Sequence, residues 1–154
     1  MTDDDRSRDL AAMLHPLFTT LVSAERPILA AHGLSMWGYT VLGALGDGPV
    51  RTQAALCEII GADKTRIISS LDALQAAGLI SRSPDPADRR VRLLSITAEG
   101  REVLRSVRAG IRSVEDRALA ALPAADRRGF LRALNALTRT TGPDDTARGP
   151  AGAR

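Results

Sequence analysis

The sequence predicts a mainly α-helical protein with one small β-hairpin, and three observations carry this prediction. Apolar residues recur every three or four positions in the first and last parts of the chain, which is typical of amphipathic helices. Between these parts, two shorter helical patterns are separated by a glycine-containing turn. Beyond them, Pro84 and Pro86 mark a turn between two short runs that favour extended backbone.

Length and composition restrict the functional classes. A chain of 154 residues is one ordinary domain that can bury a core of its own. Its net charge of +3 permits nucleic-acid binding but does not require it. The single cysteine, Cys57, excludes an intramolecular disulfide, and with two histidines it offers no zinc-ligand spacing. No apolar run approaches a membrane span of about 20 residues, and the acidic start is unlike a signal peptide, so we expect a cytoplasmic protein. We also expect no metal and no cofactor.

The first helical region covers residues 10–33 and follows a polar stretch, residues 1–9, that we expect to be flexible. Pro16 and Pro27 each remove a backbone hydrogen bond inside this region, so we expect a kink or a break near either proline. Ser35 is a suitable N-cap for a second, shorter helix.

The central pattern predicts a helix, a short turn and a second helix. Thr52 caps the first helix, Gly61 ends it, and Asp63 caps the second, which runs to Ala77. The apolar stripe of this second helix leaves a small, polar face outward, which fits the major groove of DNA. That face consists of Thr65, Ser69, Asp72 and Ala76, and it is flanked by Lys64, Arg66 and Ile68.

An arginine-rich turn follows the two helices. Residues 79–83 predict one strand, and residues 93–96 predict the strand that returns from the turn. Three arginines lie at or just beyond the tip of this hairpin: Arg89, Arg90 and Arg92. A cationic loop on a stiff stem suits a polyanion, and the element order is that of a winged helix-turn-helix. Taken alone, the arginines are also compatible with a solvated charge run that balances Asp85 and Asp88.

The last region, residues 98–141, predicts two more amphipathic helices that are separated at Pro123. Residues 142–154 are predicted to form a disordered tail. Periodicity alone does not distinguish a compact monomeric bundle from helices that interlock with a second subunit.

Two motifs in the central region resemble those of the MarR family of transcriptional regulators. The run Asp88-x-Arg90-x-x-x-x-x-Ile96-Thr97-x-x-Gly100 is similar to the family's wing signature, with isoleucine where leucine is usual. The run Leu74-x-x-x-Gly78-Leu79-Ile80-x-Arg82 is similar to the exit from its recognition helix. This resemblance implies one intertwined domain, in which a winged helix-turn-helix at residues 34–97 is flanked by dimerisation helices at residues 10–33 and 98–141.

The same resemblance implies a function and the residues that perform it. The chain would be a bacterial-type repressor or activator that binds a pseudo-palindromic operator in double-stranded DNA as a homodimer. As a repressor it would be released by a small effector. The recognition helix would contact DNA through Lys64, Thr65, Arg66 and Ser69. In the wing, Arg90 would enter the minor groove, Asp88 would orient a nearby arginine, and Arg89 and Arg92 would bind phosphate. Thr52 and Gln53, at a helix start, would add donors to a phosphate.

A small aromatic or phenolic effector is implied between the dimerisation helices and the winged region. The side chains that could line such a cavity lie on the first two helices: His15, Phe18, Trp37 and Tyr39. Core packing is the alternative role for these side chains.

Two other functions stay open. A winged helix can serve protein contact rather than DNA binding. Thiol-based redox sensing through Cys57 is the second, but sensors of this family generally carry the reactive cysteine in the first helix of the chain, so we expect a buried or inert thiol. An enzyme is not expected, because the sequence contains no glycine-rich phosphate loop, nucleophile elbow or metal cluster.

Overall fold

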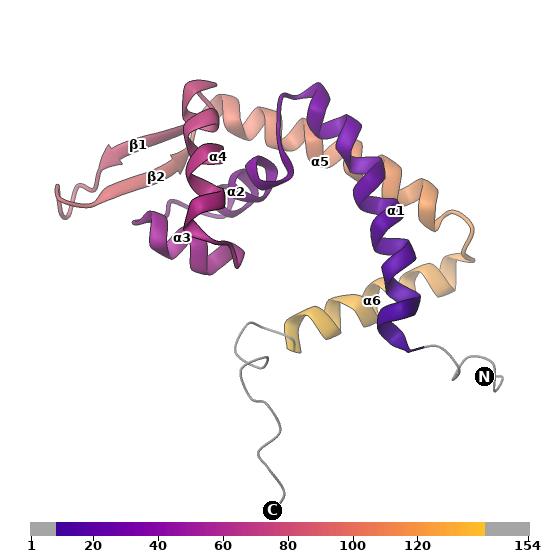
Figure 1. Ribbon diagram of the computed structural model, residues 1–154. Helices are drawn as coiled ribbons and strands as arrows, with labels where there is room; N and C mark the ends of the chain where they lie inside the picture. Colours follow the sequence, from indigo (N-terminus) through magenta and orange to yellow (C-terminus); the bar gives the residue numbers. More distant parts are fainter. Residues whose placement is uncertain (1–8, 141–154) are drawn as a thin grey trace, which may run out of the picture. The chain divides into compact units, whose positions relative to one another are not determined.

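The computed structural model describes residues 9–140, which form helices and one two-stranded sheet (Figure 1). The chain divides into two compact units, residues 1–115 and residues 116–154. The elements in chain order are α1 (Leu10–Ala31), α2 (Met36–Gly46), α3 (Gln53–Ile60), α4 (Lys64–Ala76), β1 (Ile80–Pro84), β2 (Arg92–Ile96), α5 (Ala98–Leu119) and α6 (Ala124–Thr140).

Short polar side chains start the first four helices. The predicted N-caps are confirmed at Ser35, Thr52 and Asp63, whose side chains accept hydrogen bonds from backbone N–H groups in the first turns of α2, α3 and α4. Asp9 does the same for α1. These bonds satisfy donors that a helix start leaves without an intrahelical partner. Gly61 ends α3 at a φ of 63°, a left-handed conformation that favours glycine.

Of the kink or break expected near the prolines, the break is excluded, because α1 continues through both Pro16 and Pro27. Both prolines are exposed, and so are Ala12 and Ser23, the residues four positions earlier whose carbonyls lose a helical donor. Solvent can therefore satisfy these carbonyls. At the end of α1, His32 ties the helix to α5 through a hydrogen bond of 2.9 Å between its Nε2 and the Ser106 hydroxyl.

The hairpin is an antiparallel pair in which Ile80 faces Ile96 and Pro84 faces Arg92. The first strand therefore begins and ends one residue later than predicted. Leu79 is excluded from it because its N–H donates to the Leu74 carbonyl at the end of α4. An isolated bridge pairs Val50 with Leu94, so the chain just before α3 is hydrogen-bonded to the open edge of β2.

A single apolar core holds the first unit together. The predicted stripe on α4 is confirmed, since Ile67, Leu71 and Leu74 are all buried. They pack in one cluster with buried residues of α2, α3, the hairpin and α5. Cys57 is a buried member of this cluster and is a free thiol, as expected.

The start of α5 packs tightly against the start of the hairpin. The Thr97 hydroxyl donates to the Gly78 carbonyl at 2.7 Å and accepts from the Gly100 N–H at 3.0 Å, while the Thr97 N–H donates to the Leu79 carbonyl. A Cβ added at Gly100 would lie 2.1 Å from the Leu79 oxygen. The threonine and the glycine of the wing motif are therefore required by this junction between hairpin and helix.

The second unit contains the end of α5 and α6. Asp116 and Arg127 form an ion pair within it. α6 begins directly after Pro123, whose carbonyl accepts from the Arg127 N–H. The predicted disordered tail lies outside the described residues.

No single helix in residues 9–140 is long and apolar enough to cross a membrane; α1 and α2 pass that test only as a pair, bent by 82°. In the same residues, no cluster of three or more histidine, cysteine or acidic side chains is arranged to hold a metal ion.

Candidate DNA-binding surface

The outward face of α4 carries the residues that the sequence predicts for base contact. Lys64, Thr65, Arg66 and Ser69 are all exposed along this helix. Asp63 lies at its start, where the carboxylate accepts from the Thr65 N–H at 2.9 Å. This backbone hydrogen bond, more than any other contact, lowers the pKa of Asp63. The carboxylate is thus committed to capping the helix.

The second acidic residue of α4, Asp72, is paired with a cation from the hairpin. Arg82 of β1 donates from its Nη2 to the Asp72 carboxylate at 2.9 Å. This pairing offsets the negative charge that Asp72 places on an otherwise small and polar face. Sequence reasoning placed Arg82 in a motif but gave it no contact, because the partner is ten residues earlier on another element.

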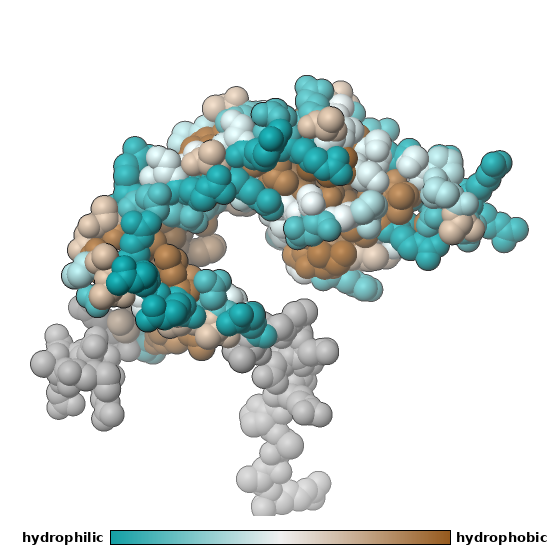
Figure 2. All heavy atoms as spheres, turned by 180° about the vertical axis from the view of Figure 1, so that it is seen from behind, coloured by the Kyte–Doolittle hydropathy of each residue, from teal (hydrophilic) through white to brown (hydrophobic). Residues whose placement is uncertain are grey.

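The wing tip presents its arginines to solvent. Arg89, Arg90 and Arg92 are exposed, with Arg92 as the first residue of β2. Hydrophilic residues cover this outer end of the hairpin, seen at the right of Figure 2. The Asp88 carboxylate accepts from the backbone N–H of Arg90 at 3.0 Å. Asp88 therefore orients the backbone of Arg90 rather than an arginine guanidinium, which differs from the expected side-chain contact.

The start of α3 supplies the third part of the surface. Thr52 is exposed, but its hydroxyl is engaged as the N-cap, accepting from the Ala55 N–H at 3.0 Å. Gln53 is half-buried at the first helical position. The first-turn N–H groups of this helix and the Gln53 amide are the donors that this end offers to a phosphate.

Arg51 and Asp85 form an ion pair that the sequence analysis missed. The Arg51 Nε donates to the Asp85 Oδ2 at 2.8 Å, across 34 positions in the chain. The other oxygen, Oδ1, accepts from the Ala87 N–H at 2.8 Å. The Ala87 bond foremost, with the contribution of Arg51, lowers the pKa of Asp85 despite its burial. Asp85 looked in the sequence like a turn residue that merely balances charge.

These ion pairs connect the three parts of the surface. Arg82 with Asp72 joins β1 to α4, and Arg51 with Asp85 joins the chain before α3 to the loop at the tip of the wing. The recognition helix, the wing and the α3 start are therefore held to one another by charged contacts as well as by the core.

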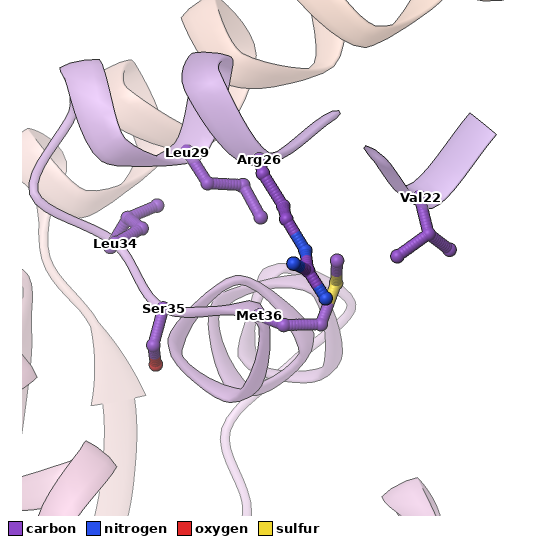
Figure 3. Close-up of a pocket in the computed structure, with 6 residues that line it drawn as sticks. All are labelled: Val22, Arg26, Leu29, Leu34, Ser35 and Met36. Atoms are coloured by element: carbon purple, nitrogen blue, oxygen red, sulfur yellow. The ribbon is translucent and has the colours of Figure 1, made fainter. Parts of the chain in front are cut away.

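A pocket of about 280 Å³ lies between α1 and the start of α2. Figure 3 shows the Arg26 side chain extending from α1 toward Met36. The pocket is lined by Val22, Arg26, Leu29, Leu34, Ser35 and Met36.

The four aromatic or histidine side chains proposed for an effector cavity lie elsewhere. His15 and Phe18 are exposed on α1, and Phe18 reaches 64% exposure. Trp37 and Tyr39 are half-buried on α2, where Tyr39 packs against the core. The structure does not bring the four together around the pocket, because its walls come from the end of α1 and the loop into α2.

Comparisons with known proteins agree with this geometry. A sequence model of the MarR family matches residues 32–91. The transcriptional regulator HosA of Escherichia coli O127:H6 is 31% identical over 102 residues, which cover 66% of this chain and 76% of HosA. HosA of Escherichia coli O111:H- is 38% identical over 66 residues, and the chain spans 49% of its length.

Solved structures share the same fold. The transcriptional repressor CouR from Rhodococcus jostii, bound to a 23-mer DNA duplex, aligns with a TM-score of 0.73 at 25% identity, over 90% of this chain and 98% of CouR. BpsR of Bordetella bronchiseptica, whose DNA binding is regulated by 6-hydroxynicotinic acid, aligns with a TM-score of 0.69 at 22% identity, over 86% of this chain and 94% of BpsR. The chain therefore belongs to the MarR family of transcriptional regulators and has their winged helix-turn-helix fold.

Proposed function

We propose that this chain is a cytoplasmic transcriptional regulator, rather than an enzyme, that binds an inverted-repeat operator as a homodimer and acts as a repressor. The observation that carries the proposal is the joined surface of α4, the wing and the α3 start. It combines exposed cations and hydroxyls with neutralised or capping carboxylates. This is the pattern expected of a surface that meets phosphates and base edges together.

Each part of the surface has its own role in this proposal. The first turns of α4 enter the major groove, where Thr65 and Ser69 hydrogen-bond base edges and Lys64 and Arg66 reach bases or phosphates. Arg90 enters the adjacent minor groove, while Arg89 and Arg92 bind phosphates on either side. Thr52 and Gln53 bring the start of α3 to a further phosphate, through the backbone donors there.

The homodimer is supported by apolar side chains that face solvent. In α1, Leu10, Met13, Leu14 and Phe18 are exposed large hydrophobic residues. In the second unit, Leu122, Leu131 and Leu134 are exposed as well. Contiguous apolar stripes on amphipathic helices mark association surfaces in otherwise soluble domains. A second copy of the chain covers them in this proposal.

We place the binding site for an effector in the pocket beside Arg26, rather than among the four side chains that the sequence predicted. Its walls are mainly apolar, and it contains one guanidinium, that of Arg26 (Figure 3). A small aromatic carboxylate matches this lining, because the ring packs on the apolar walls while the carboxylate pairs with Arg26. The first probe is 6-hydroxynicotinic acid. It should release operator DNA from the unaltered protein, and Arg26→Gln should raise the concentration required about tenfold or more. No release across a panel of aromatic carboxylates would contradict the effector proposal.

DNA binding is tested with the DNA that flanks the chain's own gene, in footprinting and fluorescence-anisotropy titrations at several salt concentrations. The proposal expects a protected inverted repeat with half-sites about 10 bp apart. Arg90→Ala should weaken specific binding by about 1–3 kcal/mol. Arg112→Ala is the matched control, because it removes the same charge from an exposed position on α5, an element that is not part of the proposed surface.

Two results would contradict the proposal. One is no protected site on any flanking DNA, which would favour use of the winged helix for protein contact. The other is equal affinity of the Arg90→Ala and Arg112→Ala proteins at every salt concentration, which would remove the wing from the interface.

A further inference from the structure

Asp85 is the only buried polar or charged residue among those whose burial the structure describes, and it organises the loop at the tip of the wing. Its backbone N–H donates to the Val91 carbonyl at 2.9 Å, and its carbonyl accepts from the Asp88 N–H at 3.2 Å. Its Oδ1 caps the turn at Ala87. Three interactions of one residue thus close the loop that carries Arg89 and Arg90.

The remaining oxygen of Asp85 reaches outside the wing, to Arg51. The two side chains differ in environment, since the Asp85 side chain is 11% exposed and the Arg51 side chain is 61% exposed. One nitrogen of Arg51, Nε, makes the bond of 2.8 Å, which leaves the outer end of a planar five-donor group in solvent. A partly buried carboxylate is thereby paired with the exposed side chain of a separate segment.

Arg51 occupies a fixed point in the chain. On one side of it, Val50 exchanges two backbone hydrogen bonds with Leu94 of β2, at 2.9 and 2.8 Å. On the other side, Thr52 caps α3. The backbone on both sides of Arg51 is therefore held in place. The Arg51 side chain reaches from this segment, which is bonded to β2, to the loop that closes the far end of the same hairpin.

We propose that Arg51 is a positioning residue for DNA binding, which holds the wing at a set angle to the α3 start through Asp85. The inference rests on the proposed DNA-binding function and deepens it. A two-stranded hairpin alone is marginally stable and bends along its length. The Arg51 brace restricts that motion before DNA arrives, so that Arg90 does not have to be ordered during binding.

The size of the effect follows from this preorganisation. Ordering one mobile, rotamer-rich side chain on binding costs a factor of about 3 to 10 in affinity. We therefore expect Arg51→Ala to weaken operator binding by about 3- to 10-fold. The DNA contacts that are lost should be those of the wing, so that minor-groove protection in a hydroxyl-radical footprint becomes weaker while the protection by α4 persists.

Two further variants separate positioning from a direct phosphate contact. Arg51→Gln loses the charge but keeps an N–H donor for Asp85, so positioning predicts a partial recovery of affinity relative to Arg51→Ala, whereas a phosphate contact predicts none. In an Arg90→Ala background, positioning predicts that Arg51→Ala has no further effect, because the group that it aims is gone. A phosphate contact predicts additive losses and a salt slope that is smaller by about 1.

A DNA-free measurement makes the inference independent of the operator. Amide hydrogen exchange at Ala87, Asp88 and Val91 reports the wing bonds directly. These amides should exchange faster in Arg51→Ala than in the unaltered protein or in Arg112→Ala, while the amides inside α4 keep their protection. Unchanged exchange, or additive losses with Arg90→Ala, would overturn the positioning role. Faster exchange in a protein that binds no DNA would instead overturn the proposed function and leave the brace as a structural contact.

Discussion

Replacement of Gly100 by alanine should loosen the junction between the hairpin and α5. The added Cβ would lie 2.1 Å from the Leu79 oxygen and 2.8 Å from the Ile96 Cγ1, and Cβ contacts below 3.0 Å are not tolerated. Because the nearest atom belongs to the backbone, the strand start and the helix must move apart. That movement also strains the bond of 3.0 Å from the Thr97 N–H to the Leu79 oxygen.

The magnitude follows from these contacts. Overpacking of a well-packed site costs about 1–3 kcal/mol, and the loss of one backbone hydrogen bond about 1 kcal/mol. Alanine is favoured over glycine in a helix by about 0.5–1 kcal/mol, which offsets part of the loss. We expect the free energy of unfolding to fall by about 1–3.5 kcal/mol, and the thermal midpoint by about 2–14 °C for a chain of this length.

The assay is thermal unfolding followed by circular dichroism, at one protein concentration because a dimer's midpoint depends on it. Gly43→Ala is the matched control, since it makes the same substitution inside α2, where the nearest atom to an added Cβ is the Arg108 Nη2 at 3.8 Å. The control should be neutral or stabilised by about 0.5–1 kcal/mol. A Gly100→Ala protein that melts within measurement error of the unaltered protein would refute the argument.

Three further predictions concern other contacts. Arg82→Ala should weaken binding to all DNA sequences by about 3- to 10-fold, because it leaves the Asp72 carboxylate unpaired on α4. Adding Asp72→Ala to the same protein should restore part of the affinity. A double variant that binds more weakly than Arg82→Ala in anisotropy titrations would contradict this. Ile68, an aliphatic side chain on α4 that is 49% exposed, should contact a thymine methyl group. Replacement of operator thymines by uracil should therefore weaken DNA binding by the unaltered protein more than binding by Ile68→Ala. Equal losses of affinity would exclude the contact. Because the pKa of Asp85 is lowered, its bonds contribute stability at neutral pH, and this stability is lost as the pH falls below about 4. The stability of Asp85→Asn, measured by urea unfolding, should therefore depend less on pH in that range than the stability of the unaltered protein. Parallel pH profiles of the two proteins would show that these bonds contribute nothing.

Local chemistry made much of the fold predictable from the sequence. Ser35, Thr52 and Asp63 cap helices in the structure because their side chains reach N–H groups only two or three residues away. The apolar stripe of α4 and the turn at Gly61 also depend on neighbours in the chain. The same locality explains why the sequence did not exclude a break in α1, since whether a proline breaks a helix depends on whether solvent or tertiary contacts can compensate its lost hydrogen bond.

In the candidate site, too, local features could be predicted from the sequence and contacts between distant residues could not. Its residue types, the arginines of the wing and the hydroxyls of α4, are visible in the sequence because hairpins and helix faces have a fixed period. The pairing of Arg82 with Asp72, and above all of Arg51 with Asp85 across 34 positions, depends on which elements the fold brings together.

Capping, periodicity and turn chemistry act over a few residues, so the helices, the hairpin and the basic character of the wing can be predicted from neighbouring residues. Which carboxylates are paired with arginines, and where the pocket beside Arg26 lies, depends on how the elements pack. Those features arise from side chains that meet across the core, and their separation along the chain leaves no periodic trace in the sequence.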